Sequence, residues 1–387
     1  MQFNIETYLN FLPDNTEKID VSKKGLTYLP DLSRFKKLIY LDCSRNQLTS
    51  LPPLNENLEE LRCSYNNLTS LPHLNKSLKC LCCFVNKLTS LPPLNENLIE
   101  LWCNCNKLTS LPQLNENLEE LRCPENYLTS LPHLNKKLKK LDCYKNQLTF
   151  LPPLNENLEE LNCFRNKLSS LPPLNITLLE LNCYENQLTS LPPLNENLRT
   201  LVCHDNQLTS LPHLNENLLW LYCYCNQLTS LPPLNEKLKY LSCRENNLNS
   251  LPPLNKNLVW LSCSKNQLTS LPSLNEKLEI LSCYENQLTS LPTLKEDLKT
   301  LECYKNPIYN NVLLLINTSF LNMQKIIILI KIINKFRDLY YSLKFKKRFI
   351  KWLWKSREKQ IAEKYHPKYL LENLKENTDL DDFLNNW

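Results

Sequence analysis

The stretch from Leu48 to Asn67, LTSLPPLNENLEELRCSYNN, recurs with a period of 20 residues as far as Asn306. Within it the frame L-x-C-x-x-N returns fourteen times, beginning at Leu41, without an insertion or a deletion. Chains of this kind grow by adding identical units, each of which contacts its neighbours. The 387 residues therefore predict one repeat array with capping segments rather than two or three globular domains.

The apolar positions of one copy predict a short strand. Leu61 and Cys63 have the period-two spacing of a strand with one buried face, so stacked copies form a parallel sheet. After about five strand residues, too few positions remain for an ordinary helix, and Pro52 and Pro53 favour extended backbone. Three further interior side chains are expected from each copy, as in Leu48, Leu51 and Leu54.

Two invariant columns have structural explanations. The asparagines from Asn46 to Asn306 lie just past each strand, where a side-chain amide can satisfy the turn and touch the next copy. The cysteines from Cys43 to Cys303 occupy a small apolar position, for which packing is the simplest role.

This frame resembles the leucine-rich repeat, L-x-x-L-x-L-x-x-N/C-x-L, at the short end of its range of about 20 to 29 residues. The 20-residue copy is similar to the short repeats of bacterial type-III effectors and of giant amoeba-infecting DNA viruses. Cysteine in the third apolar position, scarce glycine and the segment 362–370 favour the viral set. The resemblance implies an α/β repeat: a leucine-rich-repeat solenoid with a curved parallel β-sheet on the concave face, an extended convex face and short helical caps.

Some effectors of this shape have a C-terminal ubiquitin-ligase domain with a catalytic cysteine. No cysteine follows Cys303 here, so the thiolate nucleophile of that reaction is missing. The single glycine, Gly25, also excludes phosphate-binding loops, dinucleotide fingerprints and nucleophile elbows. We expect no enzymatic activity and no cofactor.

The organisation predicted along the chain has four parts. Residues 1–18 form an N-terminal cap with helical apolar spacing, and residues 19–306 form the array of about 15 repeats, the first of them degenerate. Residues 307–334 form a C-terminal cap whose apolar runs are too short to span a membrane. Residues 335–387 form a basic, helical tail.

Composition bears on compartment and partners. The chain has 18 cysteines, but its first residues have neither a basic nor an apolar signal region. We therefore expect an intracellular protein with reduced thiols, in the host cytoplasm if the source is viral. Residues 307–387 hold 15 Lys or Arg against 8 Asp or Glu, so the basic character lies in the tail.

Three clusters could hold chemistry. Cys80 and Cys82 should point outward from one strand with Cys105 beyond the next, so three thiols could meet, but no histidine stands near to complete a zinc site. His204 and Asp205 form a neighbouring pair with no nucleophile in the matching position, which favours a surface pair. His73, His133 and His213 are expected in solvated loops. No metal site is predicted.

The tail from Lys335 to Lys359 interleaves basic and apolar residues at spacings of three, four and seven, which is typical of a basic amphipathic helix. One interpretation is a capping helix with a solvated outer face. The other is an anchor for anionic membrane or nucleic acid, in which case the solenoid is a spacer.

Variation between copies locates the candidate binding surface, since positions that vary while the repeat stays constant are not needed for packing. Early strands hold mostly charges beside the inward leucine, as in Glu60 and Arg62, whereas later strands become aromatic. Aromatic clusters mark interfaces, although a cross-strand ladder that only stiffens the sheet is the alternative. We predict a monomeric, non-enzymatic scaffold that binds a protein partner on its concave face. If the source is viral, that partner is a host protein. The partner-binding residues predicted are Trp220, Tyr222, Tyr224, Tyr240 and Trp260, with His204 and Tyr284 at the margins.

Overall fold

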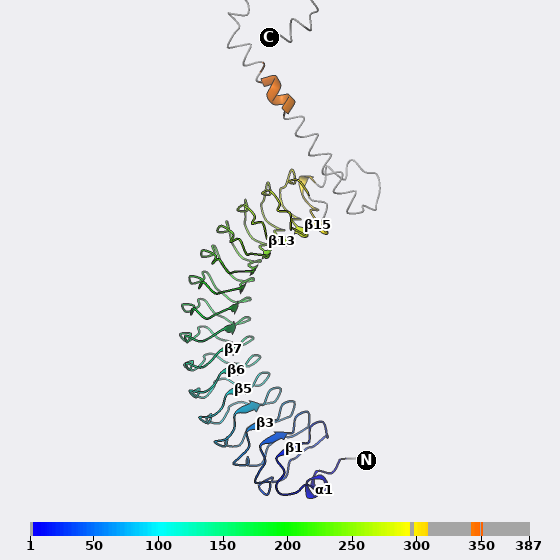
Figure 1. Cartoon of the computed structure of the whole chain (residues 1–387), viewed down its shortest axis with the longest axis vertical. Coiled ribbons are helices and arrows are strands. Elements are labelled where there is room, and N and C mark those ends of the chain that lie inside the picture. Colours follow the sequence, from blue (N-terminus) through cyan, green and yellow to red (C-terminus); the bar gives the residue numbers. More distant parts are fainter. Residues whose placement is uncertain (1–2, 295–297, 309–341, 349, 351–387) are drawn as a thin grey trace, which may run out of the picture. The chain divides into compact units, whose positions relative to one another are not determined.

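The computed structural model describes residues 3–294, 298–308, 342–348 and 350 (Figure 1). The chain divides into two units, Met1–Leu314 and Leu315–Trp387. The first unit contains the helix α1 (Ile5–Asn10) followed by fifteen strands of three residues each. The strands are β1 (Lys18–Asp20), β2 (Tyr40–Asp42), β3 (Glu60–Arg62), β4 (Cys80–Cys82), β5 (Glu100–Trp102), β6 (Glu120–Arg122), β7 (Lys140–Asp142), β8 (Glu160–Asn162), β9 (Glu180–Asn182), β10 (Thr200–Val202), β11 (Trp220–Tyr222), β12 (Tyr240–Ser242), β13 (Trp260–Ser262), β14 (Ile280–Ser282) and β15 (Thr300–Glu302).

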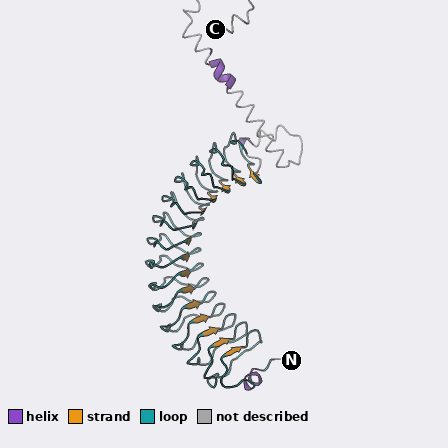
Figure 2. Ribbon diagram, viewed as in Figure 1, coloured by secondary structure: helices purple, strands orange, loops and turns teal. Residues whose placement is uncertain are grey.

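The strands form one parallel sheet in sequence order, each paired with the next. The register is in phase with the repeat, so that Leu61 opposes Leu81 and Leu81 opposes Leu101. The sheet lines the concave side of a curved solenoid (Figure 2), as the sequence predicts. Each strand is shorter than the five residues expected, although cross-repeat bonds continue past it, as from the Cys63 amide to the Cys82 carbonyl at 2.8 Å.

The core is a stack of leucines behind the sheet. In each full repeat the leucines equivalent to Leu48, Leu58 and Leu61 are buried together with the cysteine equivalent to Cys63. Leu54 and most of its equivalents are only half-buried, so this interior position expected from each copy is partly exposed. That side is extended: residues 11–294 and 298–306 contain no helix, which confirms the predicted convex face.

The asparagine column satisfies the turn as predicted. The Asn66 side-chain oxygen accepts from the Leu48 amide of the preceding repeat at 2.9 Å. Its side-chain nitrogen donates to the carbonyls of Cys43 and Cys63 at 3.0 and 3.1 Å. One amide thus joins two repeats, and the pattern recurs along the array.

A second asparagine column, at Asn55 and its equivalents, was not predicted. Asn75 donates to the carbonyls of Asn55 and Leu58, at 2.6 and 2.8 Å, and Asn95 repeats the arrangement one repeat further on. Its signal was present in the sequence, because asparagine stands at every twentieth position from Asn55 to Asn275. Two amide columns, one before and one after each strand, therefore hold the repeats in register.

Each repeat also places one residue in the left-handed backbone region. The position two after the cysteine, or after Val21 in the first repeat, has φ between 50° and 57° in all fifteen repeats, from Lys23 to Lys305. None of these residues is glycine or asparagine, the types that adopt this conformation most readily. The least suited is Val85, because its side chain is branched at Cβ.

At the N-terminus, Asn4 caps α1 by accepting from the Thr7 amide at 3.0 Å, and Ile5 and Leu9 are buried. This confirms the predicted helical spacing there. Residues 342–348 are helical, whereas the remainder of the predicted C-terminal cap and tail beyond Ile308 lies outside the described residues, Ile350 excepted. In the described parts of the chain, no helix combines the length and apolar character that crossing a membrane requires.

Candidate functional site

The concave face consists of three columns of side chains. The middle leucine of each strand points into the core, and the residues on either side of it are partly exposed in most strands. We name the positions of Glu60, Arg62 and Ser64 in every repeat the first, second and third columns. The repeats therefore share a backbone and differ mainly in what these columns present.

The first and second columns divide the concave face in two. On β2 to β9, which we name the charged half, they hold seven carboxylates and three cations. On β10 to β14, the aromatic half, they hold no charged residue at all. The charged side chains are Asp42, Glu60, Glu100, Glu120, Asp142, Glu160 and Glu180, with Arg62, Arg122 and Lys140.

Four of the predicted binding residues come together in the aromatic half, and we name them the aromatic platform: Trp220, Tyr222, Tyr240 and Trp260. The Trp220 and Tyr240 rings stack with centroids 6.1 Å apart and planes at 11°. Trp260 leans across β12 to Tyr222, with centroids 6.0 Å apart. The serine between them, Ser242, is 1% exposed, so a small residue makes room for this diagonal contact. The four aromatic side chains themselves are half-exposed.

Two other predicted residues lie elsewhere. Tyr224 and His204 belong to the third column, where they stack with ring centroids 4.0 Å apart. The stack spans five successive repeats with centroid separations of 4.0 to 4.3 Å, and we name it the aromatic ladder. Its members are Tyr144, Phe164, Tyr184, His204 and Tyr224, and the Arg244 guanidinium covers the last ring at 4.4 Å.

The last predicted residue, Tyr284, stacks on Tyr304 at 4.6 Å. Ser264, which is buried, occupies the third column immediately before Tyr284. Tyr284 is therefore not part of the platform. Close stacking covers the ring faces, so the ladder and this pair present mostly ring edges to solvent, whereas the Trp220 and Tyr240 rings of the platform lie further apart, at 6.1 Å.

His204 is buried in the ladder rather than exposed at a margin. Its Nδ1 lies 2.7 Å from an Asp205 carboxylate oxygen, yet burial is the largest influence and lowers the pKa of the imidazole below its ordinary value. His73, His133 and His213 are exposed, which confirms the loop positions predicted for them.

The cysteines fall into three groups. The fourteen in the repeat column are buried, and burial raises the pKa of their thiols, to about 12 at Cys43, Cys163 and Cys243 and well above the ordinary value at most others. Cys80 and Cys82 lie together, but Cys105 does not join them, because its thiol donates to Glu125 at 3.4 Å. The prediction that the thiols of Cys80, Cys82 and Cys105 could meet was therefore wrong. Across the described residues, no three His, Cys, Asp or Glu side chains are grouped to hold a metal ion.

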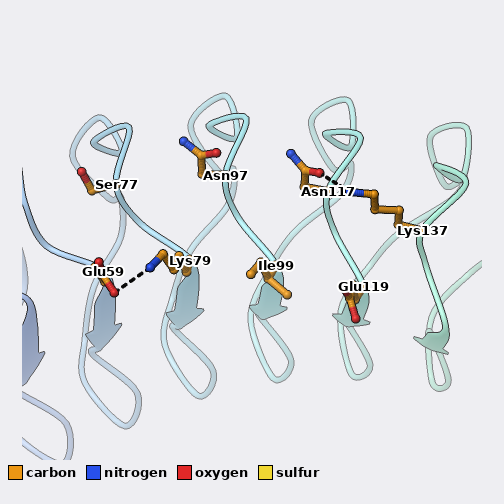
Figure 3. Close-up of a pocket in the computed structure, with 8 residues that line it drawn as sticks. All are labelled: Glu59, Ser77, Lys79, Asn97, Ile99, Asn117, Glu119 and Lys137. Carbon is orange, nitrogen blue, oxygen red and sulfur yellow. Dashed lines mark hydrogen bonds and ion pairs between the residues drawn. The ribbon is translucent and has the colours of Figure 1, made fainter.

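A shallow polar groove of about 510 Å³ lies at the N-terminal ends of β3 to β6 (Figure 3). Glu59 pairs with Lys79 there at 2.8 Å, and Lys137 donates to Asn117 at 2.7 Å. The two lysines and Glu59 of the groove therefore already have polar partners. Its lining is completed by Ser77, Asn97, Ile99 and Glu119.

Comparisons agree with the architecture. YopM, a leucine-rich effector protein from Yersinia pestis, is 34% identical over 75% of this chain and 84% of its own, with a TM-score of 0.69. The leucine-rich repeat protein LIC12759 of Leptospira interrogans is 32% identical over 79% of this chain and 93% of its own, with a TM-score of 0.64. The functional domain of InlJ from Listeria monocytogenes, which includes a cysteine ladder, is 26% identical over 71% of this chain and 69% of its own, with a TM-score of 0.57.

No protein-family model matches the sequence, and no curated protein sequence does either. The identity to YopM and LIC12759 over most of their lengths nevertheless establishes the family. The chain belongs to the leucine-rich repeat proteins with repeats of about 20 residues.

Proposed function

We propose that the protein is a non-enzymatic scaffold that binds a protein partner through its concave face, with the aromatic platform as the central contact. Leucine-rich repeat solenoids are typical interaction scaffolds, which supports the class of function. The fixed backbone with variable concave columns supports the choice of face. The observation that most directly supports the patch is the gathering of Trp220, Tyr240, Tyr222 and Trp260 on three adjacent strands.

These side chains have the properties of interface anchors. Trp and Tyr combine a large apolar area with few rotatable bonds, and they dominate binding energy in measured interfaces. On the platform they remain half-exposed without a partner chain, and no charged residue of β10 to β14 in the first two columns interrupts them. A partner could bury this area with little loss of side-chain conformational entropy.

The alternative is that the platform only stiffens the sheet, and a double substitution tests it. We expect Trp220→Ala with Trp260→Ala to weaken binding of a partner, captured with the wild-type chain and then measured by titration calorimetry, by at least about 2 kcal/mol. The melting temperature should hardly change. Unchanged affinity, or a large loss of stability, would reject the platform as the binding patch.

A matched control removes the same number of aromatic rings elsewhere. Tyr144→Ala with Tyr184→Ala opens the aromatic ladder, in which Tyr184 stacks between Phe164 and His204 and Tyr144 stacks on Phe164. This variant should lose stability and keep its affinity for the partner. An equal loss of affinity in both variants would mean that the concave face responds as a whole and has no central patch.

Absence of catalysis is part of the proposal, and two observations support it. The buried thiols have raised pKa values through desolvation, which disfavours the thiolate that attacks substrates. His204, which pairs with Asp205, is fixed inside the ladder with Tyr184 and Tyr224 against its imidazole. Neither arrangement provides a nucleophile beside a base.

A second candidate function rests on the tail. Within the helical residues 342–348, Leu343 and Phe345 are 53% and 72% exposed beside the exposed Lys346 and Lys347, a combination that suits an anionic membrane or nucleic acid. Binding of the full chain to anionic vesicles or to RNA should then fall steeply as salt rises. No binding at low salt would leave the tail only a capping role.

The remaining proposals rest on the sequence. We propose a monomer with caps at 1–18 and 307–334 and a tail at 335–387, working inside a cell where its thiols stay reduced. The repeat resemblance supports a viral source and hence a host protein as partner. Sedimentation velocity of the full chain tests the monomer directly, since a dimer would double its mass.

A further inference from the structure

An unpaired carboxylate stands at the border between the charged and aromatic halves. Among the first-column residues of β2 to β15, Glu180 on β9 alone is exposed rather than half-exposed. Glu120 and Glu160 of the same column pair with cations, whereas Glu180 forms no hydrogen bond or ion pair with the described residues. Its neighbours across the sheet are Glu160 and the neutral Thr200, and Arg199 forms no ion pair with it. Glu180 is therefore a negative charge without a counterion in the described chain.

A second open acceptor lies two residues further along β9. Asp142 lies 3.8 Å from Arg122 and accepts from the side-chain nitrogen of Asn162. Because a carboxylate only accepts, this bond fixes the direction of the amide chain, and Asn182 donates its nitrogen in turn to the Asn162 oxygen at 2.9 Å. The Asn182 oxygen is left without a donor, since Val202 opposite it has no polar group in its side chain.

The two acceptors together suit an arginine side chain. Glu180 and Asn182 flank the buried Leu181, so both project from the concave face. A guanidinium is planar, always charged and presents its donors as a fork, so one group can meet both acceptors, whereas an ammonium is a single point of charge. Its bond to a carboxylate is charge-assisted and among the stronger hydrogen bonds.

The aromatic platform begins two strands further along the same column. Trp220 and Trp260 are the first-column residues of β11 and β13. Strands about 4.8 Å apart place Trp220 about 10 Å from Glu180, and Trp260 about 10 Å beyond Trp220. A polyproline II segment has three residues per turn and rises about 3.1 Å per residue, so residues three apart share a face and lie about 9 Å apart. Such a segment, laid along the first column, matches all three positions.

The chemistry of the platform fits the same kind of segment. The indole N–H and phenol O–H groups of its four side chains form no hydrogen bond with the described residues. A polyproline II backbone has no internal hydrogen bonds, so its carbonyls are free to accept from these groups. Proline-rich segments bind to aromatic surfaces in this way, and their backbone is already ordered before binding.

We propose that the concave face binds a proline-rich segment of the partner in the polyproline II conformation. An arginine of the segment lies on Glu180 and Asn182, and prolines three and six residues away lie on Trp220 and Trp260. The motif is Arg-x-x-Pro-x-x-Pro, in either chain direction. This inference rests on the proposed function, because it uses the same platform, and adds to it the class of partner.

The test uses the full chain and two fluorescein-labelled peptides, Arg-Ala-Leu-Pro-Pro-Leu-Pro and its reverse, Pro-Leu-Pro-Pro-Leu-Ala-Arg. Binding is followed by fluorescence anisotropy in about 0.1 M salt, where charges more than about 10 Å apart are largely screened. We expect at least one peptide to bind saturably, and Glu180→Gln to weaken it about 10-fold. Trp220→Ala with Trp260→Ala should weaken it more than about 30-fold.

Two controls isolate the arginine. A peptide with glutamine in place of arginine should bind the wild type about 10-fold more weakly and should not respond to Glu180→Gln, because the interacting pair is already broken. Glu100→Gln removes the same charge from the same column on β5, four strands away, and should change the affinity less than about twofold.

The outcomes separate this inference from the proposed function. Equal losses in Glu100→Gln and Glu180→Gln would replace the arginine site by general attraction to the charged half. Binding that needs the two tryptophans but not Glu180 would reject the arginine and leave the platform standing. If neither peptide binds while the captured partner still needs the platform, the proline-rich class alone is wrong. Peptide binding unaffected by loss of the tryptophans would reject the platform as the site.

Discussion

The charged and aromatic halves of the concave face are built on the same strand, turn and core. Leu121 in one and Leu241 in the other are equally buried, and the hydrogen bonds around them repeat from strand to strand. Only the outward columns differ, with Glu120 and Arg122 in one and Tyr240 and Ser242 in the other. The comparison shows that this scaffold separates stability, which the interior determines, from recognition, which the columns determine.

The largest effect should be the same in both halves, because it concerns the shared interior. Asn126 and Asn246 each accept from a leucine amide of the preceding repeat at 3.0 Å and donate to two cysteine carbonyls at 3.1 Å. We expect either Asn→Ala substitution to cost about 3 kcal/mol in urea unfolding, since several buried backbone groups lose their partner. A cost confined to one half would show that the halves do not share one stability scheme.

The interior was predictable because its signals are periodic. Leu61, Cys63 and Asn66 recur at fixed positions, and a residue that must pack against its own copy in the next repeat has one possible environment. The second asparagine column was equally visible, at Asn75 and its equivalents, but its role depends on carbonyls that only the folded loop brings close.

The surface was less predictable, because contacts there depend on ring orientation. Trp220 and Tyr224 are both aromatic and only four residues apart, yet one belongs to the platform and the other to the ladder. The left-handed turn position had no signal in its residue types, since Val85 and its charged equivalents are poor candidates for it. Its regularity comes from the hydrogen bonds on both sides, such as that from the Val85 amide to the Asn104 carbonyl at 2.9 Å.

The second prediction uses that turn to separate the halves. Val85→Asn in the charged half should stabilise the protein by about 1 kcal/mol, because asparagine tolerates a φ of 53° better than a β-branched residue. Glu245→Asn in the aromatic half should gain less, because it breaks the bond to Lys265 at 3.0 Å. Urea unfolding of both variants is the measurement, and a Val85→Asn variant no more stable than wild type would contradict the strain at this turn.

The third prediction concerns the ladder that joins the halves. Burial lowers the pKa of His204, so the unfolded chain binds a proton more readily than the folded chain does. Stability should therefore decline as pH falls below about 6.5, the ordinary value for histidine. His204→Phe keeps the stack and should flatten this part of the stability profile. A profile unchanged by the substitution would show that His204 does not titrate on unfolding.

The smallest effect is expected from the ion pairs that give the charged half its character. Lys140 lies 2.8 Å from Glu160 on the next strand, with both side chains more than a third exposed, so water and salt screen the pair. Lys140→Ala should change the free energy of unfolding by less than about 0.5 kcal/mol. It should instead alter recognition, because it leaves the charged half with only Arg62 and Arg122 as cations in its first two columns. Association rates with the captured partner, measured at low and high salt, distinguish the two roles. A change in their salt dependence at constant stability would show that these charges act in recognition. A large loss of stability would show that they stabilise the fold instead.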